Sequence, residues 1–446
     1  MTLAGKAKKL LLAREIERRL AEYGRPYGDD EALDIQLALF NLCWRNMARE
    51  IPFYRDLQRE RGIPGTIASW EQFLELFPVT RRQDLDEAGV TKSYTKRKPD
   101  FMRITSGTTS VPVRMPAWSS ETSRTRPDRW MARTWYGIEP DDRGFYIWGN
   151  PPSLGLTEKA MQDHPGKTLY DWAVGDYRLP SYDFCEEKMR ECGRRLIAHR
   201  PGYVLAYSMA LYALAMANAH LRDEFRSLRI KAVIGGSEGF PGPDGMRMVG
   251  DVFGCPVAME YASYEAGLMA HTRPQGGYSV FWRNYFLEVG DEGPDGAGAV
   301  RVTSLYERCF PLLRYEIGDE IVPVQDAGRY GLRSFRDVVG RTHPFLLLDD
   351  GAEIHIRAVG HCVRDIVGVD AFQVVRGRDG LTLDLVFEGD LPERVEEVIR
   401  SRLDAIHPLL AEVRIRSVGM LQRTPAGKTP VVIDEPEPGG QASVSH

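Results

Sequence analysis

The stretch Ile230-Lys-Ala-Val-Ile-Gly-Gly236 has the pattern of a buried strand that ends in two glycines. A short apolar, β-branched run bounded by glycine is typical of a strand covered on both faces. Further along the chain, Val257–Glu260 is predicted to be another buried strand, which ends in a loop. Residues 181–200 have helical periodicity up to Pro201-Gly202. This alternation of strands and helices predicts an α/β architecture.

The length of 446 residues predicts more than one domain, since single cores stop growing at about 250–300 residues. Residues 1–95 favour helices, and Ser279–Val289 and Ala299–Thr303 favour a pair of strands. Beyond residue 340 the pattern is strand, strand, helix, strand, typical of a small α+β unit. The expected segments are a large N-terminal domain at 1–340, a small C-terminal domain at 341–434 and a disordered tail at 435–446.

Composition excludes several classes of protein. The chain is 43% hydrophobic and 27% charged with a formal net charge of -5, which gives no electrostatic reason to expect nucleic acid as a partner. The six cysteines are scattered without a CxxC pair, so neither a zinc site nor a disulfide framework is indicated. No stretch approaches the ~20 apolar residues that span a bilayer. We therefore expect a cytoplasmic protein without a membrane partner.

The segment Ile104-Thr-Ser-Gly-Thr-Thr-Ser-Val-Pro112 places five small hydroxyl residues around Gly107. Because nothing bulky blocks the approach, such a loop can wrap backbone N–H groups and hydroxyls around phosphate oxygens. It lacks the Gly-Lys-Ser/Thr ending of a Walker loop. Alone, the same pattern also fits an ordinary turn.

Two further segments place carboxylates near predicted strand ends. In Glu260-Tyr-Ala-Ser-Tyr-Glu-Ala-Gly267, Glu265 can reach a divalent cation and Tyr261 can offer a flat face to a base. In Pro311-Leu-Leu-Arg-Tyr-Glu-Ile-Gly-Asp319, an apolar strand runs into Asp319. A carboxylate there can accept hydrogen bonds from both hydroxyls of a ribose. Packing tyrosines and a turn aspartate are the alternative interpretation.

Two cations complete the set. Arg341, in Gly340-Arg341, can bind a phosphate or ribose oxygen. Lys428 ends the segment Arg423-Thr-Pro-Ala-Gly-Lys428 and can project its charge into a site on another domain. Each cation alone also fits a solvated surface charge, so the order and spacing of all five motifs decide the interpretation.

In that order and spacing, the motifs resemble those of the adenylate-forming (ANL) superfamily, and specifically its phenylacetate–CoA ligase-like branch. The resemblance covers nearly the whole chain and implies a large domain of mixed sheets and helices with a small mobile α+β C-terminal domain. The opening segments Ile51-Pro-Phe-Tyr-Arg and 77–85 are also similar to that branch. The matching motifs are Thr105–Pro112, Tyr261–Glu265, Pro311–Asp319, Gly340-Arg341 and Gly427-Lys428.

The resemblance implies ATP-dependent activation of a carboxylic acid as acyl-AMP, with release of pyrophosphate and then acyl transfer to CoA. It implies that Glu265 holds Mg²⁺, that Tyr261 stacks on the adenine, and that Lys428 reaches the carboxylate and the α-phosphate. Asp319 would bind the ribose with help from Arg341. The residues expected to cradle the phosphates are Thr105, Ser106, Gly107, Thr108 and Thr109, and those expected to line the adenine pocket are Gly236, Ser237 and Glu238.

The substrate acid is expected to contact Tyr207, Ser208 and Tyr264, whose aromatic and small polar side chains suit an aryl or heteroaryl acid. Three positions depart from the family pattern. Ser110-Val111 stands in place of Gly-Lys in the phosphate loop, which removes a cation unless Arg103 or Arg114 replaces it. Tyr264 replaces a small hydroxyl residue, and His343-Pro344 follows the hinge, where proline stiffens the backbone.

Alternatives therefore stay open at this point. The acceptor can be CoA, a carrier-protein thiol, or an amine or other nucleophile, the last two making the chain a standalone adenylating enzyme. A non-catalytic nucleotide-binding homologue is the alternative of another class. A homodimer is compatible with the resemblance.

Overall fold

A computed structural model gives the structure of the chain. The residues that it describes are 2–81, 84–85, 97–104, 114–148, 165–179, 186–237, 239–240, 244–292, 296–324, 328, 330–339, 345–363, 366–377, 380–387, 389, 391–419, 421–422 and 431–434.

The chain opens with four helices. They are α1 (Leu3–Gly24), α2 (Asp29–Glu50), α3 (Pro52–Arg61) and α4 (Trp70–Leu76). The Thr2 hydroxyl caps α1 by accepting from the Gly5 N–H at 3.0 Å, and Gly62 ends α3 at φ 63°. Helices α2 and α4 pack through aromatic rings, and Trp70 stacks on Phe286 with ring centroids 3.6 Å apart. The helical N-terminal region predicted from the sequence is confirmed.

An eleven-stranded sheet forms the centre of the large part, in the order β10-β11-β12-β13-β9-β8-β7-β6-β5-β3-β4. Its strands are β3 (Gly144–Ile147), β4 (Tyr177–Leu179), β5 (Tyr203–Ala206), β6 (Ala232–Gly236), β7 (Val257–Ser263), β8 (Gly267–Thr272), β9 (Tyr278–Val280), β10 (Tyr285–Glu292), β11 (Gly298–Ser304), β12 (Tyr315–Pro323) and β13 (Ser334–Val339). Strands β3 to β7 pair in parallel, whereas β7 pairs antiparallel with β8. A separate hairpin joins β1 (Phe101–Ile104) to β2 (Arg114–Ala117).

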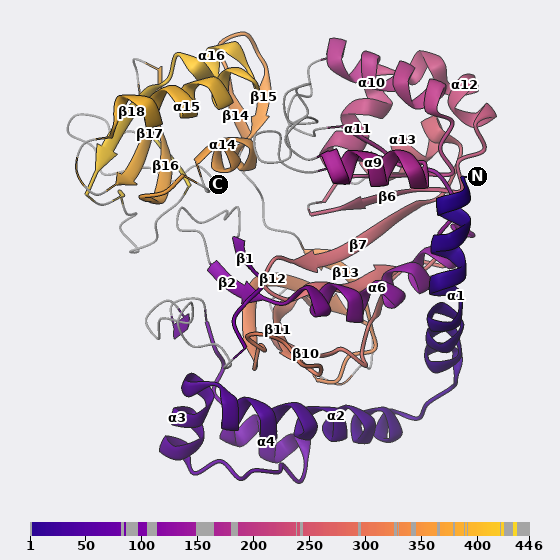
Figure 1. The fold of residues 1–446 in the computed structure, drawn as a ribbon, viewed down its shortest axis with the longest axis vertical. Helices are drawn as coiled ribbons and strands as arrows, with labels where there is room; N and C mark the ends of the chain where they lie inside the picture. Colours follow the sequence, from indigo (N-terminus) through magenta and orange to yellow (C-terminus); the bar gives the residue numbers. More distant parts are fainter. Residues whose placement is uncertain are drawn as a thin grey trace.

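Helices cover both faces of the parallel half (Figure 1). Alternate side chains point to opposite faces, so Val204 and Val233 join one core while Leu205 and Ile234 join another. The first core packs against α10 to α13, and the second contains Leu12 of α1 and other residues from α1 and α6. The helices here are α6 (Ser119–Thr134), α9 (Pro165–Val174), α10 (Glu186–His199), α11 (Ser208–Ala217), η2 (Ala219–Leu221), α12 (Arg222–Ser227) and α13 (Gly245–Phe253).

The antiparallel half of the sheet is strongly curled. Tyr261 of β7 hydrogen-bonds Asp319 of β12, although three strands lie between them in the sheet order. A flat sheet would hold those strands about 19 Å apart, at ~4.8 Å per step. Tyr285 of β10 likewise reaches the Ala266 carbonyl beside β8 at 2.8 Å. The curl therefore brings residues from distant strands to one place.

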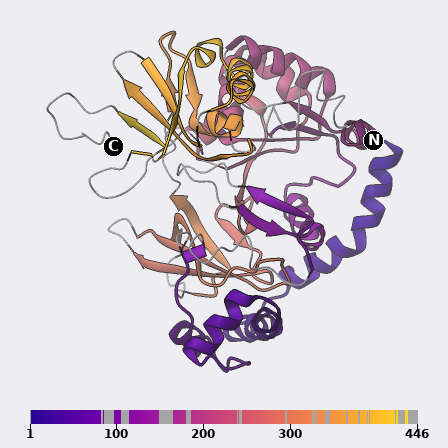
Figure 2. The ribbon, with the colours of Figure 1, turned by 60° about the vertical axis from the view of Figure 1, so that its left-hand side comes forward.

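Residues beyond 345 form a second sheet with its own hydrophobic core, seen as a separate lobe in Figures 1 and 2. The four-stranded order is β18-β17-β16-β19, with β16 and β17 antiparallel. The elements are β14 (Phe345–Leu347), β15 (Glu353–His355), α14 (Ile356–Val363), β16 (Val369–Gly377), β17 (Gly380–Phe387), α15 (Glu393–Asp404), α16 (Pro408–Ala411), β18 (Arg414–Val418) and β19 (Val432–Asp434). The strand, strand, helix, strand pattern predicted for this part is present.

The structure corrects some local predictions. Ser279–Val289 is two strands, since β9 ends at Val280 and a turn at 281–284 precedes β10. The turn places Phe281 and Trp282 against Tyr23 of α1, with centroids 6.3 and 5.9 Å away. Asp319 lies inside β12 and not at its end, because the strand continues past a bulge at Gly318, which has φ 83°.

Candidate active site

Three parallel strands end at one edge of the sheet, and two of them lead into segments predicted to bind ligands. Trp148 follows β3, Tyr207 follows β5 and Gly236 ends β6. The rings of Trp148 and Tyr207 lie 4.4 Å apart, tilted by 43°. In open α/β sheets, ligands bind outside the carboxyl ends of the strands. This edge is therefore the natural place for a substrate.

Two glycines let other groups approach the end of β6. A Cβ at Gly235 would lie 2.8 Å from Ser208 Oγ and 2.9 Å from Met259 Sδ. A Cβ at Gly236 would lie 3.2 Å from the Glu260 carbonyl oxygen. Ser237 follows with φ 71°, a left-handed conformation that costs free energy for a non-glycine residue. Backbone strain of this kind concentrates at functional sites.

Tyr261 and Asp319 meet across the curled sheet. The Tyr261 hydroxyl donates to Asp319 Oδ2 at 3.4 Å. The Tyr261 ring is 6% exposed and is met edge-on by Phe335, with centroids 5.6 Å apart at 79°. Asp319 is half-buried. Packing thus holds the Tyr261 ring in one orientation, and the hydrogen bond from its hydroxyl orients the Asp319 carboxylate.

Glu265 lies in the turn between β7 and β8, and backbone contacts on several sides hold that turn. Its carbonyl oxygen accepts from Arg308 Nη2, and the next N–H, of Ala266, donates to Ser263 Oγ at 3.0 Å. The Glu265 side chain is half-buried. The backbone is therefore fixed while the carboxylate still reaches solvent.

The Glu265 carboxylate fits a role in binding Mg²⁺. Magnesium prefers one or two carboxylates together with phosphate oxygens and water. In the described part of the chain no lysine or arginine forms an ion pair with this carboxylate, so its oxygens are available. Among those same residues, no group of three or more His, Cys, Asp or Glu side chains forms a metal cage. A single carboxylate of this kind suits a cation whose other ligands are the phosphate oxygens of a nucleotide and water.

Arg103, Glu121 and Arg308 form a charged cluster beneath this turn, in which Glu121 and Arg308 are buried and the Arg103 side chain is 15% exposed. Glu121 Oε2 contacts Arg103 Nη2 at 2.9 Å and Arg308 Nε at 3.2 Å. Glu121 Oε1 accepts from the backbone N–H groups of Trp118 and Cys309, each at 3.0 Å. The cluster connects β1, α6 and the loop before β12 to the Glu265 turn.

A second buried ion pair fixes β7 beside Tyr261. Arg133 Nη2 of α6 contacts Glu260 Oε1 at 3.0 Å, with side chains 5% and 11% exposed. Burial opposes ionisation of Glu260, but Arg133 and Arg129 outweigh it and hold the pKa of this carboxyl below its usual value. Burial lowers the pKa of neighbouring His271 below its usual value, although the Glu260 charge acts in the opposite direction.

The predicted acid-contacting residues differ in exposure. Tyr264 is 45% exposed and Tyr207 is half-buried, whereas Ser208 is fully buried. Ser208 Oγ lies 3.9 Å from Met259 Sδ, at the first turn of α11. The strand β5, which the sequence prediction did not include, separates Pro201-Gly202 from this helix.

Several predicted site residues lie outside the described residues. For the phosphate loop, the structure places only its two ends, since Ile104 pairs with Arg114 across the β1–β2 hairpin. The predicted site residues that lie outside the described part of the chain are Thr105, Ser106, Gly107, Thr108, Thr109, Glu238, Arg341 and Lys428.

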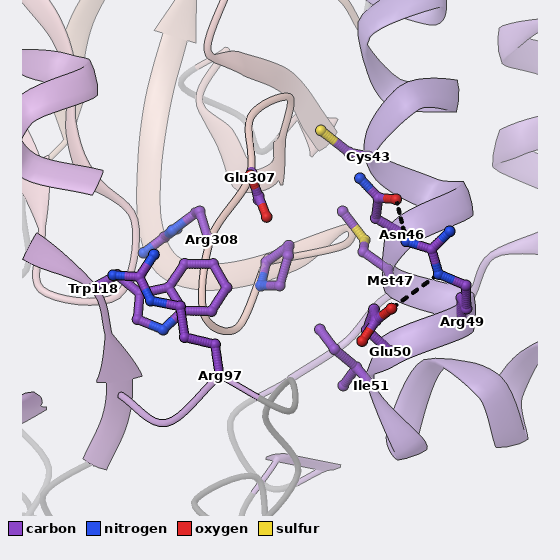
Figure 3. Close-up of a pocket in the computed structure, with 11 residues that line it drawn as sticks. Cys43, Asn46, Met47, Arg49, Glu50, Ile51, Arg97, Trp118, Glu307 and Arg308 are labelled. Atoms are coloured by element: carbon purple, nitrogen blue, oxygen red, sulfur yellow. Dashed lines mark hydrogen bonds and ion pairs between the residues drawn. The ribbon is translucent and has the colours of Figure 1, made fainter. Parts of the chain in front are cut away.

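A cavity of about 230 Å³ lies below the Arg308 loop, against α2 (Figure 3). Met47, Ile51 and Pro311 line it together with Trp118 and one side of Arg308. Among the described residues, none of those predicted for the site lines it. The cavity lies where α2 packs against the loop that carries Arg308 and Pro311.

Sequence reasoning missed Trp148, Glu121 and Arg308. An aromatic residue directly after a buried strand was a usable signal for Trp148, because it must lie at the same edge as Tyr207. Glu121 and Arg308 are 187 positions apart, and no local pattern connects them. Their partnership becomes visible only once the sheet is folded.

No protein-family model matches the sequence, and no curated protein matches it significantly. Solved structures do match. Three structures of 2-hydroxyisobutyryl-CoA ligase, each with 2-HIB-AMP, are similar to the chain at 18% identity. The TM-score is 0.55 for the thioesterification state with CoA and 0.53 for the postadenylation state, each covering 91% of this chain and 89% of that chain. The open form with CoA has a TM-score of 0.51 over 90% and 91%.

The chain has the adenylate-forming fold. The predicted fold class is thereby confirmed, with mixed sheets and helices in the large part and a smaller α+β part after it. No helix in the described part of the chain is both long enough and apolar enough to cross a bilayer.

Proposed function

We propose that the chain is an AMP-forming acid ligase of the adenylate-forming superfamily, and that it belongs to the phenylacetate–CoA ligase-like branch. It joins a carboxylic acid to AMP, releases pyrophosphate and passes the acyl group to CoA. The observation that carries the proposal is the Tyr261–Asp319 contact beside Gly236 and the Glu265 turn, in this fold. These residues are the motif residues that the sequence resemblance marks for nucleotide and metal.

The chemistry requires compensation of negative charge. A carboxylate oxygen attacks the α-phosphorus of ATP, the new P–O bond forms, and the bond to the β-phosphate oxygen breaks. Both reactants are anions, so cations must offset their repulsion and the charge that moves onto pyrophosphate. Bound Mg²⁺ supplies part of that neutralisation, and Glu265 is the residue that we assign to hold it.

Other residues orient the nucleotide in this proposal. Asp319 accepts hydrogen bonds from the ribose hydroxyls, and the Tyr261 hydroxyl keeps its carboxylate in position. We assign Gly236, the last residue of β6, and Ser237, which follows it, to the adenine pocket. We assign Lys428, carried by a small domain at 341–434, to the carboxylate and α-phosphate, and Arg341 to the hinge side of the ribose.

An aryl or heteroaryl acid is the proposed substrate class. The rings of Trp148 and Tyr207, 4.4 Å apart at the strand edge, offer flat apolar surface to an aromatic acid. Exposed Tyr264, in the turn between β7 and β8, is a further residue that we assign to the acid pocket. CoA is the proposed acceptor because the similar ligase binds both an acyl-AMP and CoA in its crystal structures.

Acid-dependent ATP–pyrophosphate exchange tests the proposal. The wild type is assayed with a panel of aryl, heteroaryl and short aliphatic acids, with Lys428→Ala as control. We expect exchange with aryl acids that collapses in the variant. Exchange with aliphatic acids alone would remove the substrate assignment, and ATP binding without exchange for any acid would indicate a non-catalytic nucleotide-binding protein.

A further inference from the structure

The cluster of Arg103, Glu121 and Arg308 has more positive charge than its own carboxylate balances. Two guanidinium groups share one oxygen of Glu121, and the Arg308 and Glu121 side chains are 2% and 0% exposed. Burying a charge without a counter-charge is costly, and a surplus cation in such a place stabilises an arriving anion. The cluster as a whole is therefore prepared to receive negative charge.

Arg103 is the member with an unused donor. Its Nη2 is taken by Glu121, but among the described residues its buried Nη1 has no hydrogen-bond partner. Buried polar atoms are nearly always paired, so an orphaned donor calls for an explanation. Burial first, and then the neighbouring Arg308, lower the pKa of Arg103, which reflects the same uncompensated charge.

The position of Arg103 in the fold points to phosphate. It lies on β1, two residues before the phosphate-loop motif, whose ends Ile104 and Arg114 pair in the hairpin. The same cluster contacts the backbone of the proposed metal-binding residue, because Arg308 Nη2 donates to the Glu265 carbonyl. The cluster therefore joins the strand that leads into the phosphate-loop motif to the turn that carries the proposed metal ligand. The loop itself has Val111 where the resembling family has lysine.

We infer that Arg103 binds the terminal phosphates of ATP in place of the lysine that the phosphate loop lacks, and that Glu121 and Arg308 position it. This inference rests on the proposed function, because it concerns the same nucleotide site. Arginine matches phosphate through two parallel N–H donors, so a guanidinium held by Glu121 on one nitrogen still presents the other. The ligand class is a polyphosphate anion: ATP before the reaction and pyrophosphate after it.

The test compares ligands that differ only in these phosphates. Binding of MgATP, magnesium pyrophosphate and AMP is measured by calorimetry for the wild type, Arg103→Gln and Arg103→Lys. The control is Arg97→Gln, which removes an exposed arginine that pairs with Asp100 outside the cluster. No substrate acid is needed.

We expect Arg103→Gln to weaken the binding of MgATP and of magnesium pyrophosphate by about tenfold to a hundredfold, as for loss of a charged hydrogen bond. The affinity for AMP should stay unchanged. Arg103→Lys should lose less of the affinity for MgATP and magnesium pyrophosphate, and Arg97→Gln should bind all three ligands as the wild type does. Equal loss of ATP and AMP would make Arg103 merely structural, and an unchanged ATP affinity would also overturn the inference. If Arg103→Gln does not fold, the ATP-to-AMP ratio in Arg103→Lys decides. A wild type that does not bind MgATP would overturn the proposed function itself.

Discussion

The Tyr261 hydroxyl donates a hydrogen bond to Asp319 Oδ2 over 3.4 Å and so connects β7 to β12 across three intervening strands. The contact exists because the antiparallel half of the sheet curls and because the bulge at Gly318 lies beside Asp319. Two motifs that are 58 positions apart thereby become one site. In the proposed function this site holds the ribose.

Replacing Asp319 by asparagine should weaken the binding of MgATP and of AMP equally, by about tenfold to a hundredfold, because both ligands carry the ribose. Tyr261→Phe removes only the supporting hydroxyl and should cost a few-fold. Calorimetric titration with both nucleotides measures these losses. The ribose assignment fails if Asp319→Asn binds AMP as tightly as the wild type does.

Glu265→Gln should raise the Mg²⁺ concentration for half-maximal pyrophosphate exchange by about tenfold and lower the maximal rate, since a neutral amide is a poorer magnesium ligand. The matched control is Glu307→Gln, an exposed residue near the cavity and outside the proposed site. An unchanged magnesium dependence in Glu265→Gln would show that another group holds the metal.

Gly235→Ala should destabilise the large domain by about 1–3 kcal/mol, because the added methyl overlaps the end of β6 with its neighbours. Its Cβ would lie 2.8 Å from Ser208 Oγ and 2.9 Å from Met259 Sδ. Gly65→Ala is the control, since nothing lies within 4 Å of the added atom there. Urea denaturation should separate the two variants, and equal midpoints would contradict the close approach.

Glu260→Gln should destabilise the protein by about 3–5 kcal/mol near neutral pH, because Arg133 would be left buried and unpaired. The pKa of Glu260 in the folded state lies below the ordinary value of 4.5, so the carboxylate stabilises the fold above that pH. The stabilisation is lost as the pH falls from 4.5 through the lowered folded-state pKa.

Urea denaturation of wild type and Glu260→Gln at several pH values checks this. The difference in unfolding free energy should be constant above about pH 5.5 and shrink below the ordinary carboxyl pKa. A difference that grows on acidification would mean that the pKa of Glu260 is raised in the folded state.

Local patterns were enough to predict the α/β class, and they singled out Tyr261 and Asp319, which the fold brings into contact. The run ending in Gly235-Gly236 is apolar on both faces, so it predicts a central strand, and β6 is one. The position of Asp319 inside β12 was not predictable, because the strand passes Gly318 with a bulge set by pairing with β11. Trp148 and the Arg103–Glu121–Arg308 cluster depend on long-range contacts in the same way.

The most direct test of the account follows the oxygen of the substrate. An acid active in pyrophosphate exchange is labelled with ¹⁸O in its carboxylate and converted in the presence of ATP, Mg²⁺ and CoA. If the carboxylate attacks the α-phosphorus, the C–O bond breaks on acyl transfer and one labelled oxygen stays on AMP. The account predicts singly labelled AMP and unlabelled pyrophosphate. Label in inorganic phosphate, with ADP as the nucleotide product, would contradict adenylation.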